Sequence, residues 1–502
     1  MPRKPFIITL DQGTTSCRAL AFDSLGEPVA QSQQPIAQSY PRPGWVEEDP
    51  NEILQTQIQV LRDVARQLSE RFSSDASSIA GIGITNQRET VVLWDRKTGQ
   101  PVYPAIVWQC RRTAEICARL RGEGQEDWVH QRTGLVLDAY FSATKLMWLF
   151  ENDPALLARA SSGELLAGTI DSWLIWNLTG GRSHVTDVSN ASRTLLMNLK
   201  TGRWDEDLLR LFNIPAAILP TIVPSAGQYG VLDEAIIPGR IPLAGLAGDQ
   251  QAALFGQACF EPGMTKNTYG TGCFLLMQTG TTPVFSKQGL LTTVAWDIGQ
   301  GLNYALEGSV FNTGSAIQWL RDELKIISRA SDCDVLAASV TSTDGVQFVP
   351  AFTGLGAPHW DMAARGLICG ITRGTTGAHI ARAVLESIAL QSQDVLQIMH
   401  EEAGFRIPKM RVDGGASVSD LLMQLQADIS QVPVDRPRVT ETTAFGAAAL
   451  AGIGLSVWPG QQTIAELRQC DRIFQPNPVD LQHRQRQIAW QKAIAAARAI
   501  GS

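Results

Sequence analysis

The sequence predicts an α/β fold of two similar lobes with a cleft between them, divided near residue 255. A strand, a turn of glycine and threonine, and a returning strand occur at 6–22 and again at 264–278. Apolar strands and helices follow one another through both halves. The 502 residues correspond to two to four domains at roughly 150 residues each. We therefore expect one domain at 1–254 and another at 255–502.

The elements of the first half follow from apolar spacing. Three short strands are expected within 6–36, and Asp49 with Pro50 opens a helix. Apolar residues between Ile53 and Leu68 recur at helical spacing, which extends this helix to about Arg71. The further elements expected here are strands at 79–85 and 90–95, helices at about 111–121 and 142–152, and loops at 213–245.

The second half repeats the opening pattern. The strand at 264–268 leads through the turn 269–272 into a strand at 273–278. A long helix is marked by apolar residues from Ile380 to Met399 and ended by Gly404. The further elements expected here are a helix at about 312–325, a strand at 410–413 before a glycine turn, a helix at about 419–430, and a small-residue helix at 444–455.

Composition favours a well-buried globular enzyme, with 44% hydrophobic and 18% charged residues. A formal charge of −7 argues against nucleic acid as the main partner. The eight cysteines form no Cys-x-x-Cys pair and no metal-like cluster with the six histidines, so we expect reduced thiols. The apolar run before Asp11 is too short for a signal peptide, and no segment has the ~20 apolar residues of a membrane span. We expect a soluble cytoplasmic protein.

The segment 6–16 is the most informative part of the chain. Its apolar run ends in Asp11 and turns through Gly13, which lets the backbone approach a ligand closely. Thr14, Thr15 and Ser16 can then surround phosphate oxygens with their amides and hydroxyls. Asp11 is placed to hold Mg²⁺ through water. This indicates nucleotide chemistry without a Walker loop, because no G-x-x-x-x-G-K-[ST] occurs. An ordinary hairpin with a polar turn fits this segment equally well.

Seven motifs follow one another along nearly the whole chain. As an ordered set they are specific for one protein family, although each alone is a weak signal. They are Asp11-Gln12-Gly13-Thr14-Thr15, Asn86-Gln87-Arg88-Glu89-Thr90, Trp108-Gln109-Cys110-Arg111-Arg112-Thr113, Tyr140-Phe141-Ser142-Ala143-Thr144-Lys145, Gly248-Asp249-Gln250-Gln251, Tyr269-Gly270-Thr271-Gly272-Cys273-Phe274 and Asp413-Gly414-Gly415-Ala416. By them the chain resembles the FGGY carbohydrate kinase family of the actin-like ATPase superfamily. The resemblance implies two actin-like (ribonuclease H-like) lobes around a central cleft. It also implies ATP-dependent phosphorylation of glycerol to sn-glycerol 3-phosphate.

The resemblance implies two catalytic aspartates and a site for glycerol. Asp249 would accept the hydroxyl proton during in-line transfer of the γ-phosphoryl group, and Asp11 would anchor Mg²⁺. Trp108 and Phe274 would form apolar walls for the three carbons. The residues expected to bind glycerol are Arg88, Glu89, Trp108, Tyr140, Asp249, Gln250 and Phe274.

The resemblance also implies a nucleotide site, in which Arg18 would offset charge on the γ-phosphoryl group. Members of the family commonly carry Asn where this chain has Ser419, which keeps one hydroxyl donor but loses the reach of the amide, and we expect adenine still to bind. The implied partners are glycerol, ATP and Mg²⁺ in a homodimer or homotetramer, with no nucleic acid and no integral membrane segment. The residues expected to bind ATP or ADP are Thr14, Thr15, Ser16, Arg18, Thr271, Gly314, Gln318, Gly415, Ala416 and Ser419.

Each motif also has a purely structural interpretation. Trp108 could be one of 13 tryptophans that pack a core, Arg88 and Glu89 could be a surface ion pair, and Tyr140 a buried phenol. Two other functions stay open: a kinase of the same fold acting on another polyol or a ketose, and a non-enzymatic actin-like or chaperone-type nucleotide switch. The combination of Asp249 with the polar residues above argues against the switch, which would need no polyol site.

Overall fold

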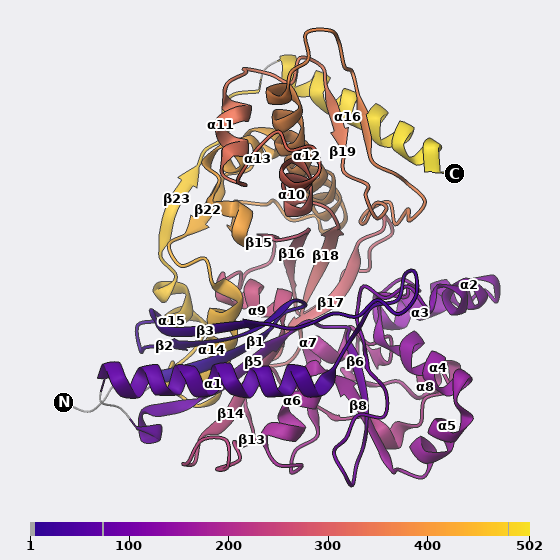
Figure 1. Cartoon of the computed structure of the whole chain (residues 1–502), viewed down its shortest axis with the longest axis vertical. Coiled ribbons are helices and arrows are strands. Elements are labelled where there is room, and N and C mark those ends of the chain that lie inside the picture. Colours follow the sequence, from indigo (N-terminus) through magenta and orange to yellow (C-terminus); the bar gives the residue numbers. More distant parts are fainter. Residues whose placement is uncertain (1–5, 73–74, 480, 502) are drawn as a thin grey trace.

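The computed structural model describes residues 6–72, 75–479 and 481–501. One large mixed β-sheet forms in each half of the chain, and the two sheets lie one above the other with helices on their faces (Figure 1). The first sheet consists, from edge to edge, of β13 (Gln228–Val231), β14 (Pro242–Gly248), β5 (Ile79–Asn86), β1 (Phe6–Gln12), β2 (Ser16–Phe22) and β3 (Pro28–Pro35). The second consists of β17 (Leu291–Trp296), β18 (Asn303–Val310), β16 (Cys273–Gly280), β15 (Thr265–Tyr269), β21 (Met410–Asp413), β22 (Val434–Pro437) and β23 (Cys470–Phe474).

The two sheets repeat one pattern of strand directions. In the first, β1 is antiparallel to β2 and β2 to β3, while β1, β5 and β14 are parallel and β13 is antiparallel at the edge. In the second sheet, β15, β16 and β18 repeat the antiparallel part. The parallel part is repeated by β15, β21 and β22, and β23 is the antiparallel strand at the edge. The prediction of two similar α/β lobes is therefore confirmed. The turns 13–15 and 270–272 join the first strand pair of each sheet, and Tyr269, expected in the second turn, is instead the last residue of β15.

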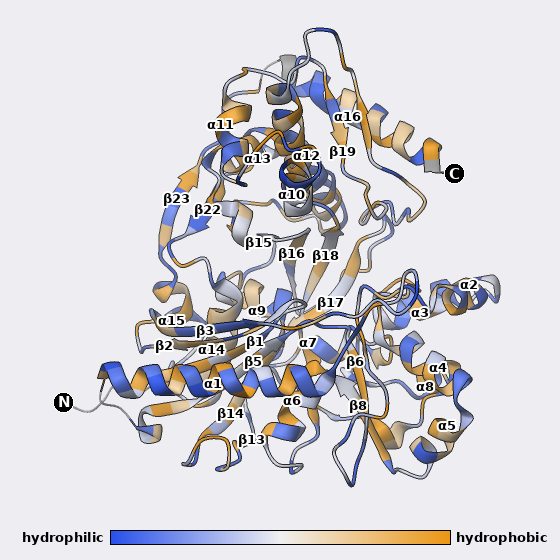
Figure 2. Ribbon diagram, in the orientation of Figure 1, coloured by the Kyte–Doolittle hydropathy of each residue, from blue (hydrophilic) through white to orange (hydrophobic). Residues whose placement is uncertain are grey.

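The helices cover the sheets through apolar faces. In α1, Ile53, Leu61 and Leu68 are buried, and Figure 2 shows hydrophilic and hydrophobic residues in bands along this helix. The expected long helix α12 ends at Gly404, which adopts a left-handed φ of 69°. The helices are α1 (Pro50–Phe72), α2 (Ala114–Gly122), α3 (Glu126–Thr133), α4 (Ser142–Asn152), α5 (Pro154–Ser161), α6 (Ile170–Leu178), α7 (Val188–Ala191), α8 (Glu206–Leu211), α9 (Asp249–Gly256), α10 (Gly314–Asp322), α11 (Asp332–Ala338), α12 (Gly377–Ala403), α13 (Asp420–Ser430), α14 (Thr442–Gly454), α15 (Gln461–Leu467) and α16 (Leu481–Gly501).

The expectation of loops throughout 213–245 is wrong. This stretch contains β12 (Thr221–Val223), β13 and the first residues of β14. Strands of three or four residues are too short to show a periodic signal, and the prolines and glycines around them hid β14. The remaining strands are β4 (Glu47–Glu48), β6 (Val91–Asp95), β7 (Ala105–Ile106), β8 (Leu165–Thr169), β9 (Val185–Asp187), β10 (Met197–Asn198), β11 (Arg203–Trp204), β19 (Gln347–Val349) and β20 (Leu367–Cys369).

All eight cysteines are free thiols, six of them buried, while Cys369 is half-buried and Cys470 exposed. Among the described residues, no helix combines the length and hydropathy needed to cross a bilayer. The cellular compartment stays a prediction.

Helix α14 ties the two halves together. Although it belongs to the second half, it packs against β1, β5 and β14 of the first sheet and crosses α9, as the gold helix in the lower part of Figure 1 shows. At the crossing a Cβ atom on Gly446 would overlap the carbonyl oxygen of Ala252, and one on Gly256 the carbonyl oxygen of Thr442. Glycine is therefore required for the two backbones to approach this closely. The domain boundary at residue 255 stays a prediction.

We predict that Gly446→Ala lowers the free energy of unfolding by about 1–3 kcal/mol, because the added methyl group must push α14 away from α9. Denaturant unfolding followed by circular dichroism measures this change. Gly122→Ala in α2 is the control, since a Cβ there meets no atom within 4 Å. Equal stability of the two variants would show that the helix crossing is not tightly packed.

Candidate active site

A cavity of about 680 Å³ opens between the two halves of the chain. Residues from both halves line it, including the two turns that join the first strand pair of each sheet. The predicted site residues that line this cavity are Thr14, Thr15, Arg88, Glu89, Trp108, Tyr140, Asp249, Thr271 and Phe274. The structure thus brings together side chains that are up to 260 positions apart in the sequence, 14 to 274.

Several of the polar residues that line the cavity lie just after the ends of two strands of the first sheet. Arg88 and Glu89 follow the carboxyl end of β5, and Asp249 follows the carboxyl end of β14. These strands are parallel neighbours, with Gly248 opposite Asn86, so both ends reach the same edge of the sheet. In α/β sheets this edge is where ligands bind.

Asp249 is a carboxylate that lines the cavity. Its Oδ1 accepts a hydrogen bond from the amide of Gln250 at 2.8 Å and lies 3.3 Å from Nε of Arg88. Desolvation raises the pKa of Asp249 to about 6, and Arg88 opposes this shift only in part. Since 34% of the side chain is exposed, the carboxylate remains open to a ligand in the cavity.

Aromatic rings line the cavity beside these charges. Trp108 meets Tyr140 edge-on with ring centroids 5.5 Å apart, and its Nε1 donates a hydrogen bond to Oγ1 of Thr14 at 2.9 Å. The ring of Phe274, from the second half, faces Arg88, with its centroid 6.0 Å from Cζ of the guanidinium. Buried Lys145 donates to the carbonyl oxygens of Tyr140 and Glu89, which fixes the backbone of both residues. Sequence reasoning assigned Lys145 no role.

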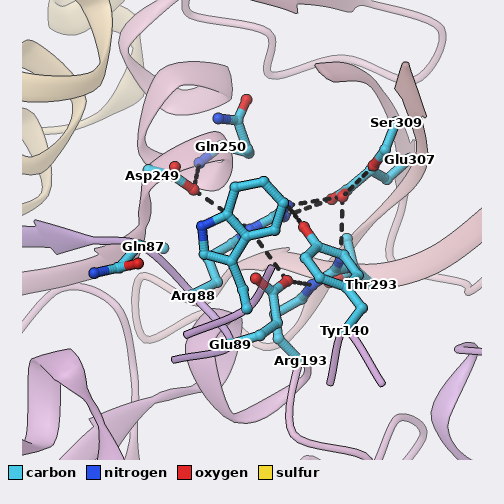
Figure 3. A network of polar contacts seen from close by, with 12 residues as sticks. Gln87, Arg88, Glu89, Tyr140, Arg193, Asp249, Gln250, Thr293, Glu307 and Ser309 are labelled. Atoms are coloured by element: carbon cyan, nitrogen blue, oxygen red, sulfur yellow. Dashed lines mark hydrogen bonds and ion pairs between the residues drawn. The ribbon is translucent and has the colours of Figure 1, made fainter. Parts of the chain in front are cut away.

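A buried network of charges underlies the cavity, and sequence reasoning missed half of it. Figure 3 shows Arg88 and Glu89 joined to Arg193, which follows α7, and to Glu307 on β18. The carboxylate of Glu307 accepts hydrogen bonds from both terminal nitrogens of Arg88, at 2.5 and 2.8 Å. The available signal was a lone carboxylate within the apolar strand 303–310, since a charge in a buried strand requires a partner.

Lys266 is a second functional candidate that the sequence did not reveal. It is buried on β15, where its Nζ donates to Oε1 of Gln250 and, at 2.8 Å, to Oγ1 of Thr268. Burial lowers the pKa of Lys266 to about 8, against the attraction of Asp413 and Asp249. Gln250 is therefore held by a cation from the other half, and its contact with a substrate stays a prediction.

Asp11 and Arg18 form an ion pair next to the first turn. Both contacts, from Nε at 3.1 Å and from Nη2, fall on Oδ2 of Asp11. Arg18 also pairs with Glu441, which precedes α14, at 2.7 Å. These carboxylates, Asp11 first, raise the pKa of Arg18. Ser16 begins β2 and accepts a hydrogen bond from Gln33 at 2.9 Å. The phosphate contacts of Arg18 and Ser16 stay predictions.

Among the nucleotide residues expected in the second half, Thr271 lies within the turn 270–272 and Gly314 contacts this turn. Gly314 begins α10, and its amide donates to the carbonyl oxygen of Gly270 at 3.1 Å. Ser419 caps α13 by accepting a hydrogen bond from the amide of Leu422 at 3.0 Å. None of Gly314, Gln318, Gly415, Ala416 and Ser419 lines the cavity, so their roles stay predictions.

Comparisons with known proteins give consistent matches over the whole fold. Models of the N- and C-terminal domains of the FGGY family of carbohydrate kinases match residues 6–256 and 265–455. The chain is 55% identical to glycerol kinase 2 of Thermotoga maritima and 54% identical to glycerol kinase of Symbiobacterium thermophilum, over 99% of each sequence. Among solved structures it is similar to Plasmodium falciparum glycerol kinase with ADP, with a TM-score of 0.92, 36% identity and 98% coverage of both chains. A xylulose kinase from Rhodospirillum rubrum matches with a TM-score of 0.85 and 26% identity over 99% of each chain.

Proposed function

Because this chain belongs to the FGGY family of carbohydrate kinases, we propose that it transfers the γ-phosphoryl group of ATP to a terminal hydroxyl of glycerol. The product is sn-glycerol 3-phosphate, and the activity is that of a glycerol kinase in glycerol catabolism. One observation carries the proposal: a carboxylate with a raised pKa, polar donors and aromatic walls meet in the same interlobe cavity as two hydroxyl-bearing turns.

The cavity suits a three-carbon polyol. Trp108 and Phe274 contact the carbon chain, while Arg88, Glu89 and Tyr140 bond the hydroxyl groups. A site built on such hydrogen bonds rejects analogues that leave its polar groups unpaired. Tyr140 and Arg88 already share a hydrogen bond of 3.2 Å, so their positions are set before the substrate binds.

Asp249 is the general base of the proposed reaction. Its carboxylate accepts the proton of the attacking hydroxyl as the oxygen forms its bond to the γ-phosphorus and the bond to the ADP oxygen breaks. A pKa of about 6 leaves the group ionised near neutral pH and still basic enough to accept a proton. Its exposed edge faces the cavity in which the hydroxyl would lie.

The two turns hold the phosphates from opposite sides. Thr14 and Thr15 belong to the turn of the first sheet and Thr271 to that of the second, and all three line the cavity. Backbone amides and hydroxyls in such turns form concave sites for anions. The adenosine lies farther into the second half, against Gly314, Gln318, Gly415, Ala416 and Ser419.

The surroundings of Asp11 fit a magnesium ion held through water. Both contacts from Arg18 use Oδ2, and Oδ1 makes no hydrogen bond within the described residues. Magnesium in kinases is bound by one or two carboxylates together with phosphate oxygens and waters. When bound, the ion neutralises charge that develops on the phosphates.

Closure of the two lobes over both substrates completes the proposal, because exposed ATP would otherwise transfer its phosphoryl group to water. The crossing of α9 and α14 is the hinge we favour, since the backbones of the two halves meet there with no room for a Cβ atom on Gly446. A homodimer or homotetramer and a cytoplasmic location are also part of the proposal.

Asp249→Asn should bind glycerol and turn over roughly 10²–10⁴-fold more slowly, because an amide cannot accept the proton. Coupled ADP release and calorimetric titration with glycerol measure the two effects. Asp394→Asn is the matched control, because burial also raises the pKa of Asp394 to about 6 but this residue lies outside the cavity. Normal turnover of the Asp249 variant would remove this residue from the role of base.

The kcat/KM for glycerol should fall tenfold per pH unit below about pH 6. Asp249 acts only as the carboxylate, and its raised pKa brings protonation within reach of mildly acidic pH. Initial rates at saturating ATP between about pH 5 and pH 8 test this, with folding checked at each pH by circular dichroism. A flat profile down to about pH 5 in folded protein would contradict the assignment.

A further inference from the structure

Glu307 lies at the centre of the charge network and comes from the half of the chain opposite to Arg88. It is fully buried in the middle of β18, whereas Arg88 follows β5 of the first sheet. In Figure 3 its carboxylate faces the guanidinium of Arg88 from the side away from Asp249. Glu307 does not line the cavity, so any role in the reaction must act through other residues.

The carboxylate of Glu307 fixes the orientation of Arg88. Nη1 and Nη2 of Arg88 bind Oε2 and Oε1 at 2.5 and 2.8 Å, which is the two-pronged geometry that orients a guanidinium most firmly. This leaves Nε directed at the cavity, 3.3 Å from Oδ1 of Asp249 and 3.5 Å from Oε1 of Glu89. The base therefore meets one nitrogen of Arg88 rather than its two-pronged end.

Glu307 holds Arg193 as well. Nη2 of Arg193 donates to Oε1 of Glu307 at 3.0 Å, and its Nε donates to Oε1 of Glu89 at 2.8 Å. Burial favours the neutral acid, but Arg193 and Arg88 outweigh it and lower the pKa of Glu307 to about 2. Glu307 thus stays charged and balances two arginines that face the substrate-binding carboxylates.

We propose that Glu307 is a positioning residue for the phosphoryl transfer, which keeps Arg88 from closing onto Asp249 and so leaves that carboxylate available as the base. The inference rests on the proposed function. It assigns to the second half of the chain a direct part in arranging the polyol site of the first half.

The consequence for Asp249 follows from the charges around it. Arg88 and Glu89 face it from the end of β5 and Lys266 from β15, while Gln250 donates its amide from α9. Removing the charge of Glu307 leaves Arg88 and Arg193 with less compensation, so Arg88 turns its terminal nitrogens toward Asp249. Both changes favour the carboxylate, lower its pKa, and weaken it as a base.

The test is Glu307→Gln, which keeps the shape and one oxygen acceptor but removes the charge. We expect kcat with glycerol to fall about 10–100-fold, as for a misplaced reacting group. We also expect the acid limb of the kcat/KM profile, which is the fall of kcat/KM at acidic pH, to move to lower pH. The KM for ATP should change less than about twofold, because within the described chain Glu307 does not line the cavity and makes no hydrogen bond to the residues of either turn. The ¹³C NMR titration of the Asp249 carboxyl, assigned by its absence from Asp249→Asn, gives the same pKa shift without turnover.

Glu386→Gln is the matched control. Glu386 is also a buried glutamate between two arginines, Arg382 and Arg486, both at 3.1 Å, but it lies on α12 outside the cavity. It should lower stability without moving the acid limb. Glu307→Asp, which retains the charge, should keep the acid limb in place and serves if the glutamine variant does not fold.

The outcomes separate this inference from the proposed function. An unchanged acid limb and NMR titration in folded Glu307→Gln would overturn the positioning role. An equal shift of the acid limb in the Glu386→Gln control would also overturn it. The same holds if the acid limb of Glu307→Asp shifts as far as that expected for Glu307→Gln. Absence of glycerol-dependent ADP release in the wild-type protein would instead overturn the proposed function, while the NMR titration would still decide the role of Glu307.

Discussion

The mutual neutralisation of Arg88, Arg193, Glu89 and Glu307 beneath the cavity is the constraint on which the site depends. Each of these side chains is at most 2% exposed, and an isolated charge so placed would cost several kcal/mol. Removing a single member of such a buried pair destabilises by about 3–5 kcal/mol, because the partner is left uncompensated. Since Glu307 comes from the second half and the others from the first, this network, and with it the proposed polyol site, needs both halves.

The duplicated sheets explain how the two halves divide the proposed work. Each sheet begins with a hairpin whose turn reaches the cavity, so under the proposed function matching structures hold the phosphates from both sides. Helix α14 crosses back to cover the first sheet, and Arg18 pairs with Glu441 beside it. The halves are therefore joined by packing at the crossing of α9 and α14 and by this ion pair, while the two turns border the cavity. This arrangement suits the proposed closure about the helix crossing.

The sequence predicted what local patterns can encode. Asp249 was identified through the family resemblance, whereas the hairpins, α1, and α12 with its terminal Gly404 all follow from spacing and composition. The partners of buried charges do not: nothing near Glu307 in the chain shows that it meets Arg88, 219 positions away. Likewise the small residues at 444–455 predicted a helix without indicating which sheet it covers. Cavity-lining residues were found through ordered motifs, and the residues that orient them only through the fold.

The proposed function requires this cavity to select a three-carbon polyol. The most direct test is the kcat/KM for ADP release from Mg·ATP with glycerol, dihydroxyacetone, erythritol, xylulose, ribulose and gluconate. We expect glycerol to give the highest value, because the aromatic rings of Trp108, Tyr140 and Phe274 line the cavity beside the polar groups of the proposed glycerol site. A preference for a ketose or a sugar acid would contradict this. The fold and the phosphate chemistry would then stand, but these aromatic residues would not limit the size of the substrate.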